Sequence, residues 1–301
     1  MWFKNLRIYL LQQPLNLSQE AMEEQLKSKS FQSCGSQELM SMGWDTPLGR
    51  QSEMLVHEIA GCQMICARQE EKLLPSSVIN EIVEEKISEI EQGEGRKVGR
   101  KERTELREDT FQQLLPQAFS RHTRQYAMID KQQGWILVDA ASANRAEALI
   151  TLLRDTLGSL PVKPLESATA PSFIMTEWLK HPGQHKNFSL LDSCELQDRS
   201  EEASVVRCKG QDLTADEILA HLEAGKDVVK LAIEWDERIS CLIESDLSIK
   251  RLRFLDLIQE QAADNQIETE ADAFDSHFTL MCLEFRRFLP SLIELFGGAS
   301  E

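Results

Sequence analysis

The chain has 301 residues, of which 42% are hydrophobic and 28% charged, and its formal net charge is −17. This length allows two or three domains with substantial cores, and this composition excludes a largely disordered chain. No run approaches the ~18 consecutive apolar residues that a membrane helix needs. Because residues 1–7 lack the apolar stretch of a signal peptide, we expect a cytoplasmic protein that does not bind membranes.

Short strands and one helix are predicted before residue 75. We expect a strand at 6–11, a helix at 19–27 capped by Asn16 or Ser18, a loop region from Gly35 to Gly49 around Trp44, and strands near 53–59 and 62–68 that are joined by a tight turn at Ala60-Gly61.

Residues 75–116 predict a helical hairpin. Pro75 opens a helix whose apolar residues recur at helical spacing as far as Ile90. Three glycines then interrupt the pattern, and a second helix runs from about Arg100 to Leu115. Few apolar positions could anchor its far end, so we expect a projecting finger with its tip near 93–100.

The remaining sequence alternates strands and helices in hairpin order. We expect strands at 125–130 and 135–139, a helix at 143–157, a linker at 158–164, a helix near 172–180, strands near 187–191 and 203–208, a helix opened by a capping box at 214–217 and ended at Ala224-Gly225, strands at 227–234, 238–244 and 249–254, and a long helix near 268–296 that contains Pro290.

These elements predict an α+β fold class with antiparallel sheets, packed helices and a projecting helical hairpin. Residues 1–74 with 117–162 would form a central α+β domain, and residues 75–116 the finger. Residues 163–301 would form a second α+β domain, the base.

Charge is distributed unevenly along the sequence. Residues 96–124 contain eight Lys and Arg against four Asp and Glu, a local charge of +4. Residues 255–280 contain seven Asp and Glu and no Lys or Arg. This asymmetry suits a protein with one basic surface and an acidic exterior.

The seven cysteines are scattered, and only Cys62 and Cys66 lie close together. They have no CxxC or CxxH partner, so we interpret them as buried hydrophobic residues rather than half of a metal site. We expect free thiols in a reducing compartment.

Local motifs for catalysis or a cofactor are weak. The sequence contains no phosphate-binding loop of the GxxxxGK[ST] type, and His181 and His185 are separated by Pro182-Gly183, so they cannot share a helix face. Asp130 and Asp139 lie near the ends of neighbouring predicted strands. They could hold a metal ion for a nuclease, but turn and capping roles are favoured. We expect no cofactor and no metal.

The basic segment is the best functional candidate. Five cations crowd the predicted tip, and aromatic and basic residues crowd the predicted loop after the second helix. Positive charge beside aromatic rings suits phosphate contact with stacking, although a solvated hairpin with internal charge pairs fits equally well. These residues are Arg96, Lys97, Arg100, Lys101 and Arg103 at the tip, and Phe119, Arg121, His122 and Arg124 near Tyr126 in the loop.

Blocks along the whole chain resemble the recombination-associated RdgC family. They occur in order and at matching spacing: Trp2–Leu6, Cys34–Gln37, Met42–Trp44, Ile65–Arg68, Glu70–Pro75, Leu114–Arg121, Leu157–Pro161, Thr176–Trp178, Gln211–Thr214 and Glu223–Lys226.

The resemblance implies a non-enzymatic protein that forms a homodimeric ring around DNA. Such proteins bind single- and double-stranded DNA with little sequence preference, act in the nucleoid and limit the access of the RecA recombinase to DNA. The resemblance also assigns roles to individual positions. Arg96, Lys97, Arg100 and Arg103 match basic positions of the family's finger, Phe119 matches an aromatic residue at the finger's base, and Lys209 and Gln211 match polar residues near a dimer contact. We expect these residues to contact DNA, together with Lys101, Arg121 and Arg124.

Two positions depart from the family pattern: Gln117 stands where Arg is expected, and Gly210 where Lys is expected. The acidic exterior also leaves open a regulator of recombination that binds a basic protein rather than DNA.

Overall fold

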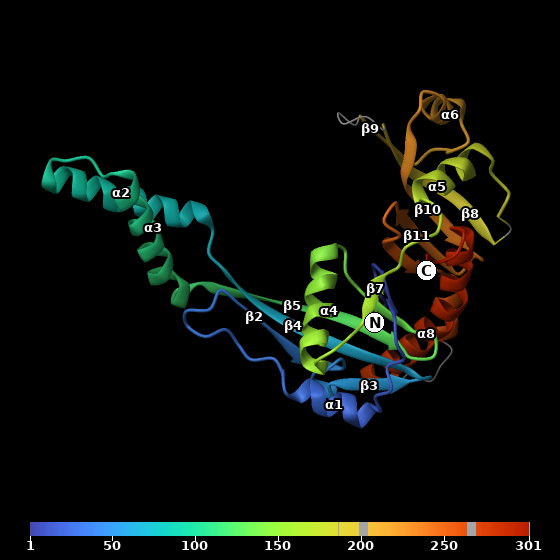
Figure 1. The fold of residues 1–301 in the computed structure, drawn as a ribbon, viewed down its shortest axis with the longest axis horizontal. Helices are drawn as coiled ribbons and strands as arrows, with labels where there is room; N and C mark the ends of the chain where they lie inside the picture. Colours follow the sequence, from blue (N-terminus) through green and yellow to red (C-terminus); the bar gives the residue numbers. More distant parts are fainter. Residues whose placement is uncertain (186, 199–203, 264–268, 301) are drawn as a thin grey trace.

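The computed structural model describes residues 1–185, 187–198, 204–263 and 269–300. These residues form an α+β fold with two antiparallel sheets and eight α-helices, as the sequence predicts. The chain is an open crescent in which a helical hairpin forms one arm and the second sheet with its helices forms the other (Figure 1). None of the helices in these ranges is long and apolar enough to cross a lipid bilayer.

The first sheet has the strand order β2-β4-β5-β6-β1-β7, and β3 pairs with β4. Leu149, Ile150 and Leu153 of a helix pack against Ile65 and Ile129 of the sheet, and all five side chains are fully buried. The elements of this part are β1 (Arg7–Leu11), α1 (Gln19–Lys27), β2 (Met40–Asp45), β3 (Val56–Ile59), β4 (Cys62–Leu73), β5 (Phe119–Asp130), β6 (Trp135–Val138), α4 (Ala143–Leu157) and β7 (Val162–Pro164), with a short 3-10 helix at Gly49–Gln51.

The finger extends from the longest strand pair of the molecule. Strands β4 and β5 pair along their full length and continue into α2 (Ser76–Glu94) and α3 (Arg100–Leu114), with a 3-10 turn at Leu115–Gln117. A small core of Ile79, Val83 and Ile87 holds the two helices together. As predicted, they form a projecting hairpin (Figure 1), although α2 continues past Gly93 before the left-handed Gly95 ends it.

The second sheet has the strand order β12-β11-β10-β8-β9. Its core contains a cluster of aromatic side chains, and it also takes in Phe3, Met64 and Met128 from the first part of the chain. Its elements are α5 (Pro171–Lys180), β8 (Phe188–Gln197), β9 (Val205–Lys209), α6 (Asp216–Glu223), β10 (Asp227–Trp235), β11 (Ile239–Glu244), β12 (Ile249–Phe254), α7 (Asp256–Ala263) and α8 (Glu270–Leu295).

Three predictions of irregular structure are wrong. The expected loop around Trp44 is strand β2, which pairs with β4 through Gly43. The expected loop after the second finger helix is the first half of β5. The expected linker contains β7, which pairs with β1. In each case a partner strand distant in the sequence supplies the hydrogen bonds that local composition does not reveal.

Two local predictions in the second half also need correction. The expected capping box before α6 is absent; instead the Asp212 carboxylate accepts the backbone N–H of Thr214 at 2.9 Å and its hydroxyl at 2.7 Å. Helix α7 was not predicted. The long last helix begins after a capping box made by Thr269 and Asp272, and residue 268 lies outside the described ranges.

The expectation that all cysteines are free is wrong for one pair. Cys62 of β4 and Cys282 of α8 form a disulfide although 220 positions separate them in the sequence. The sequence could not show this proximity, because it depends on how α8 packs against the first sheet, where Cys62 and Cys282 share one core. Cys66 is free and fully buried, as predicted, and burial raises the pKa of its thiol to about 11.

Candidate nucleic-acid interface

The tip of the finger carries cations of two kinds. The Arg96 guanidinium lies 2.5 Å from the Glu94 carboxylate and 2.7 Å from that of Glu102, and hydrogen bonds to both raise its pKa. Lys97 and Arg100 are exposed, and no carboxylate among the described residues pairs with them. These two side chains are therefore the ones immediately available to an anion.

Two neighbouring cations on α3, Lys101 and Arg103, are paired like Arg96. Lys101 lies 3.7 Å from Glu105, and Arg103 lies 3.1 Å from Glu84 of α2. Exposed ion pairs of this kind are weak and exchange readily for other partners. Phosphate can compete for these cations, although it has to displace a carboxylate to reach them.

The finger as a whole is acidic. Residues 75–116 contain ten Asp and Glu against seven Lys and Arg, because α2 carries six glutamates. The local charge of +4 found for residues 96–124 therefore does not describe the folded arm. The finger is basic only where α3 begins and where the chain turns.

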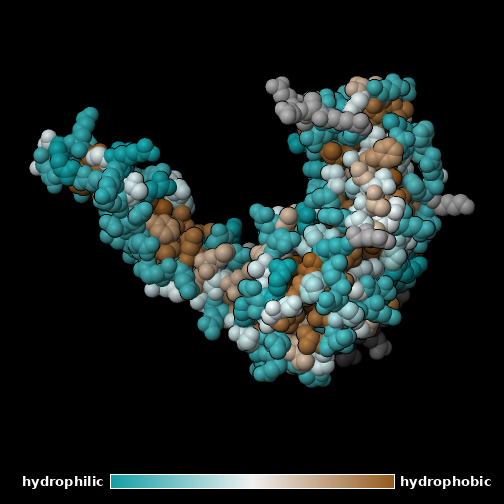
Figure 2. Space-filling model, in the orientation of Figure 1, coloured by the Kyte–Doolittle hydropathy of each residue, from teal (hydrophilic) through white to brown (hydrophobic). Residues whose placement is uncertain are grey.

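An exposed apolar surface lies at the base of the finger. Phe119 begins β5 and is 85% exposed; its cross-strand partner Leu73 is 42% exposed. Met40, opposite Glu71 in the next strand, is 57% exposed on the same face. Figure 2 shows hydrophobic side chains (brown) gathered along the lower part of the finger, below a hydrophilic tip.

The pleat of β5 separates residues that the sequence places together. Phe119 and Arg121 point to one face, where Arg121 lies 2.7 Å from Glu71. His122 and Arg124 point to the other face.

On that second face, β4 contributes a basic residue that sequence reasoning missed. Arg68 lies directly opposite Arg124 in the strand pair, and the Asp45 carboxylate is 4.0 Å from Arg68 and 3.7 Å from Arg124. The Arg68 guanidinium lies 4.5 Å from the centre of the Phe31 ring. Only the pairing of β4 with β5 brings these side chains together.

Lys209 and Gln211 lie on the other arm of the crescent, at the end of β9 (Figure 1). Gly210 between them has a φ of +71°, and its N–H donates to the Asp192 carbonyl at 2.8 Å. Lys209 lines a hollow of about 480 Å³, and Gln211 lines a different one of about 700 Å³ beside Trp178. A lysine at position 210 would need this left-handed backbone, which favours glycine.

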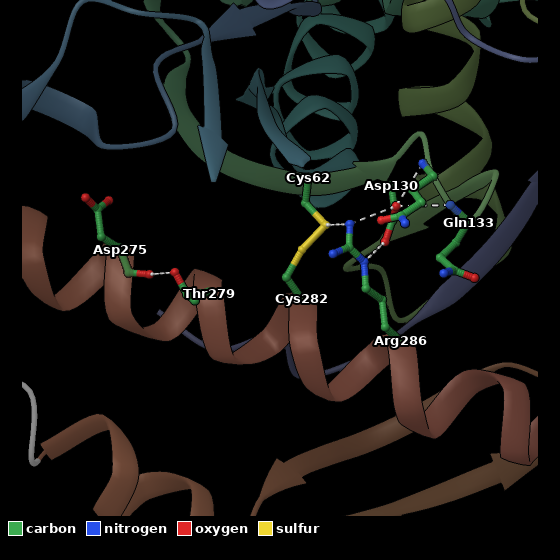
Figure 3. Close-up of a disulfide and its surroundings, with 8 residues drawn as sticks. Cys62, Asp130, Gln133, Asp275, Thr279, Cys282 and Arg286 are labelled. Atoms are coloured by element: carbon green, nitrogen blue, oxygen red, sulfur yellow. Dashed lines mark hydrogen bonds and ion pairs between the residues drawn. A yellow bond between two sulfur atoms is a disulfide. The ribbon is translucent and has the colours of Figure 1, made fainter. Parts of the chain in front are cut away.

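The two aspartates considered for a nuclease have structural partners. The Asp130 carboxylate accepts the backbone N–H groups of Gln132 and Gln133, both at 3.1 Å, and Arg286 Nε at 2.6 Å (Figure 3). Asp139 accepts the N–H groups of Lys4 and Asn5 at 3.2 and 2.9 Å, and burial raises its pKa. Asp130 therefore has the turn role that the sequence analysis favours, whereas Asp139 binds a distant segment of the chain rather than a turn or a helix end.

One group of potential metal ligands occurs among the described residues: Cys62, Asp130 and Cys282. Figure 3 shows why they do not suit a cation. The two sulfurs are bonded to each other, and the Arg286 guanidinium lies against both Asp130 and Cys62 Sγ, the latter at 3.6 Å.

Comparison with known proteins identifies the family. A family model described as "Putative exonuclease, RdgC" matches residues 1–299. The chain is 46% identical to the recombination-associated protein RdgC of Pseudomonas aeruginosa over 299 residues, which cover 99% of this chain and 98% of that protein. It is 43% identical to the protein of the same name from Yersinia pestis, over 100% of this chain and 99% of the relative. The chain therefore belongs to the RdgC family, as its sequence blocks predict.

Proposed function

We propose that this RdgC-family chain binds single- and double-stranded DNA without sequence preference and limits the access of RecA to it. The observation that carries this proposal is the finger, which presents at its tip Lys97 and Arg100, unpaired within the described part of the chain, and at its base the exposed ring of Phe119. Cations that contact phosphate and rings that stack on bases together give binding that is strong but indifferent to sequence.

We further propose that two chains close into a ring around DNA in the nucleoid of the cytoplasm. The open crescent supports this, since a second copy facing the first would enclose the space between the arms (Figure 1). Residues 1–74 with 117–162, the finger at 75–116, and residues 163–301 would then act as three domains of one protomer. Sedimentation equilibrium should give twice the 34.3 kDa of the chain.

Salt dependence of DNA binding tests the proposal. Affinity measured by fluorescence anisotropy should fall steeply with salt, because the cations replace counterions on the phosphates. Lys97→Ala with Arg100→Ala should lower the log–log slope by about 1.4 on single strands, at ~0.7 per lost contact, and should weaken all sequences alike. Lys27→Ala with Arg154→Ala removes the same charge elsewhere and should leave the slope unchanged. DNA binding that does not respond to salt would overturn the proposal.

A regulator that acts through acidic surfaces is the second candidate, and the net acidity of the finger favours it. The two candidates differ in the effect of the Lys97→Ala, Arg100→Ala variant on RecA filament assembly. If DNA binding is the mechanism, the variant loses its restraint on RecA together with its affinity for DNA. If a protein contact is the mechanism, restraint persists with no DNA bound.

The family description also names an exonuclease, whereas we propose a protein without enzymatic activity and without a metal or other cofactor. Incubation of end-labelled linear DNA with the protein and Mg²⁺ or Mn²⁺ decides between them. Intact ends are expected, and progressive shortening that is lost in Asp130→Asn or Asp139→Asn would establish the nuclease.

A further inference from the structure

The second sheet has one covered face and one open face. Trp235, Ile239 and Ile243 point into the aromatic core beneath α5 and α8. Alternate residues of the same strands, Lys230 and Glu244 among them, point to the opposite face, because side chains alternate along a strand. Two adjoining hollows lie on this side.

The two hollows form one continuous basic surface, which we name the open-face groove. One has a volume of about 480 Å³ and the other about 700 Å³, and both are lined by Asn5 and Arg251. Together they are lined by seven Lys and Arg and three Asp and Glu, a net charge of +4. In a chain of −17 this concentration of positive charge is unusual, and it equals that of residues 96–124.

The carboxylates of the groove neutralise only part of this charge. Glu195 lies 2.7 Å from Arg207 and 3.3 Å from Lys230. Glu244 lies 3.5 Å from Lys230 and 3.9 Å from Lys250. Burial, with the nearby positive charges of Arg7 and Lys230, lowers the pKa of Lys250 against the pull of Glu244.

Four cations along the groove remain available. Lys4, Lys209, Arg251 and Arg253 are exposed, and within the described ranges no carboxylate pairs with them. Of the paired cations, Lys230 and Lys250 are partly buried, whereas Arg207 is exposed. An anion placed over the groove meets four cations without having to displace a carboxylate.

Arg251 is held in an unfavourable backbone conformation at the junction of the two hollows. Its φ is +50°, in the left-handed region that long side chains rarely adopt. It lies in a β-bulge, because Ser240 pairs with Arg253 while Leu242 pairs with Lys250, so two residues of β12 oppose one of β11. Bulges redirect side chains and are frequent beside functional sites.

We infer that the open-face groove binds the phosphodiester backbone of a nucleic-acid strand. Arg251, which lines both hollows, would contact phosphates in either of them. The inference rests on the proposed function and adds a second contact surface on the other arm of the crescent. A guanidinium is suited to this position, since its planar donors bind phosphate oxygens in pairs. The finger and the groove would then hold the same DNA from the two arms.

A charge-removal variant tests the groove separately from the finger. The triple variant is Lys209→Ala, Arg251→Ala and Arg253→Ala. It should lower the log–log salt slope on single-stranded DNA by about 2, at ~0.7 per lost contact. Its binding at low salt should be weaker by roughly 100-fold. The matched control is Lys27→Ala, Arg154→Ala and Lys180→Ala, which removes the same charge outside the groove. It should bind like wild type.

The outcomes separate the two proposals. If wild-type protein binds DNA and the groove variant keeps its affinity and slope, the groove inference is wrong while the proposed function stands. If the groove variant and the control lose DNA affinity equally, the groove inference is also wrong, because the loss would then reflect the total charge of the chain. If wild-type protein does not bind DNA, both proposals fail.

Single substitutions of Arg251 guard against a folding artefact. Arg251→Gly removes the charge and the backbone conflict together, so its melting temperature should hold or rise while its slope falls by about 0.7. Arg251→Lys keeps the charge and should keep most of the slope. Wild-type binding by Arg251→Gly would contradict the role of this residue.

Discussion

Phe119→Ala provides the sharpest test of the finger's base. Complete burial of a Phe side chain contributes about 1.5–3 kcal/mol to stability. Because the side chain is 85% exposed, its removal should cost the folded chain less than about 0.5 kcal/mol. For a chain of this size that corresponds to at most about 2 °C in melting temperature.

The same exposed ring can contribute more free energy to DNA binding than it contributes to folding. Stacking of one base on an aromatic side chain is worth about 1–3 kcal/mol. Phe119→Ala should therefore raise the dissociation constant for single-stranded DNA by roughly 5- to 150-fold, at a factor of ten per ~1.4 kcal/mol. Phe119→Trp retains an aromatic face and should restore binding.

Thermal unfolding and anisotropy on the same preparations measure both effects. Phe173→Ala is a matched control, since that side chain is 52% exposed on α5, and it should change neither quantity. A fall in melting temperature well above 2 °C would mean that Phe119 packs within its own chain. Unchanged DNA affinity together with weaker self-association in sedimentation would instead make it a contact between protomers.

Three further outcomes are expected. Glu94→Gln with Glu102→Gln should tighten DNA binding and steepen its salt slope by about 0.7–0.9, because Arg96 loses the two carboxylates that compete with phosphate. Unchanged DNA affinity in anisotropy would contradict this. Asp139→Ala should lower the free energy of unfolding by roughly 1–3 kcal/mol, because two backbone N–H groups lose their acceptor, whereas Asp139→Asn should retain it. Burial raises the Asp139 pKa, so the folded state binds this proton more tightly than the unfolded chain does. The free energy of unfolding of wild type should therefore fall as pH rises above the ordinary pKa of 3.8. Over that range, urea titrations should show the stability of Asp139→Asn rising relative to that of wild type. Cys282→Ser opens a closed loop of 220 residues and should lower the free energy of unfolding by about 3–5 kcal/mol. A reductant should lower the melting temperature of wild type but not of the variant. A wild-type melting temperature that does not change with reductant would show the two thiols to be free.

The sequence predicts best those elements whose stability is local. Helices at 19–27 and 143–157 begin and end at the predicted residues. In both, a serine side chain accepts a backbone N–H at the first turn, and apolar residues recur along one face. Of the two caps considered for the first helix, Ser18 is the one used.

Prediction fails where a distant strand supplies the partner. The outer halves of β4 and β5 are mostly polar, and they are strands because they pair with each other at the foot of the finger. Composition alone predicts a loop at residues 117–124, with Phe119 and Arg124 on one surface. The structure has a strand there, and its pleat places the two side chains on opposite faces. The bulge at Arg251 is equally invisible, since it exists only in the register of β12 against β11.

The structure also changes how charge bears on DNA binding by this acidic chain. Ions screen exposed charges beyond about 8 Å at physiological salt, so the net charge of −17 contributes little at a contact. What matters is whether each cation already has a carboxylate beside it. Arg96 and Arg103 both add to the charge counted over residues 96–124, yet each is paired with a carboxylate. Lys97, Arg100 and Arg251 have no carboxylate partner among the residues that the structure describes. The salt slope should therefore follow the unpaired cations on the two arms rather than the basic segment alone.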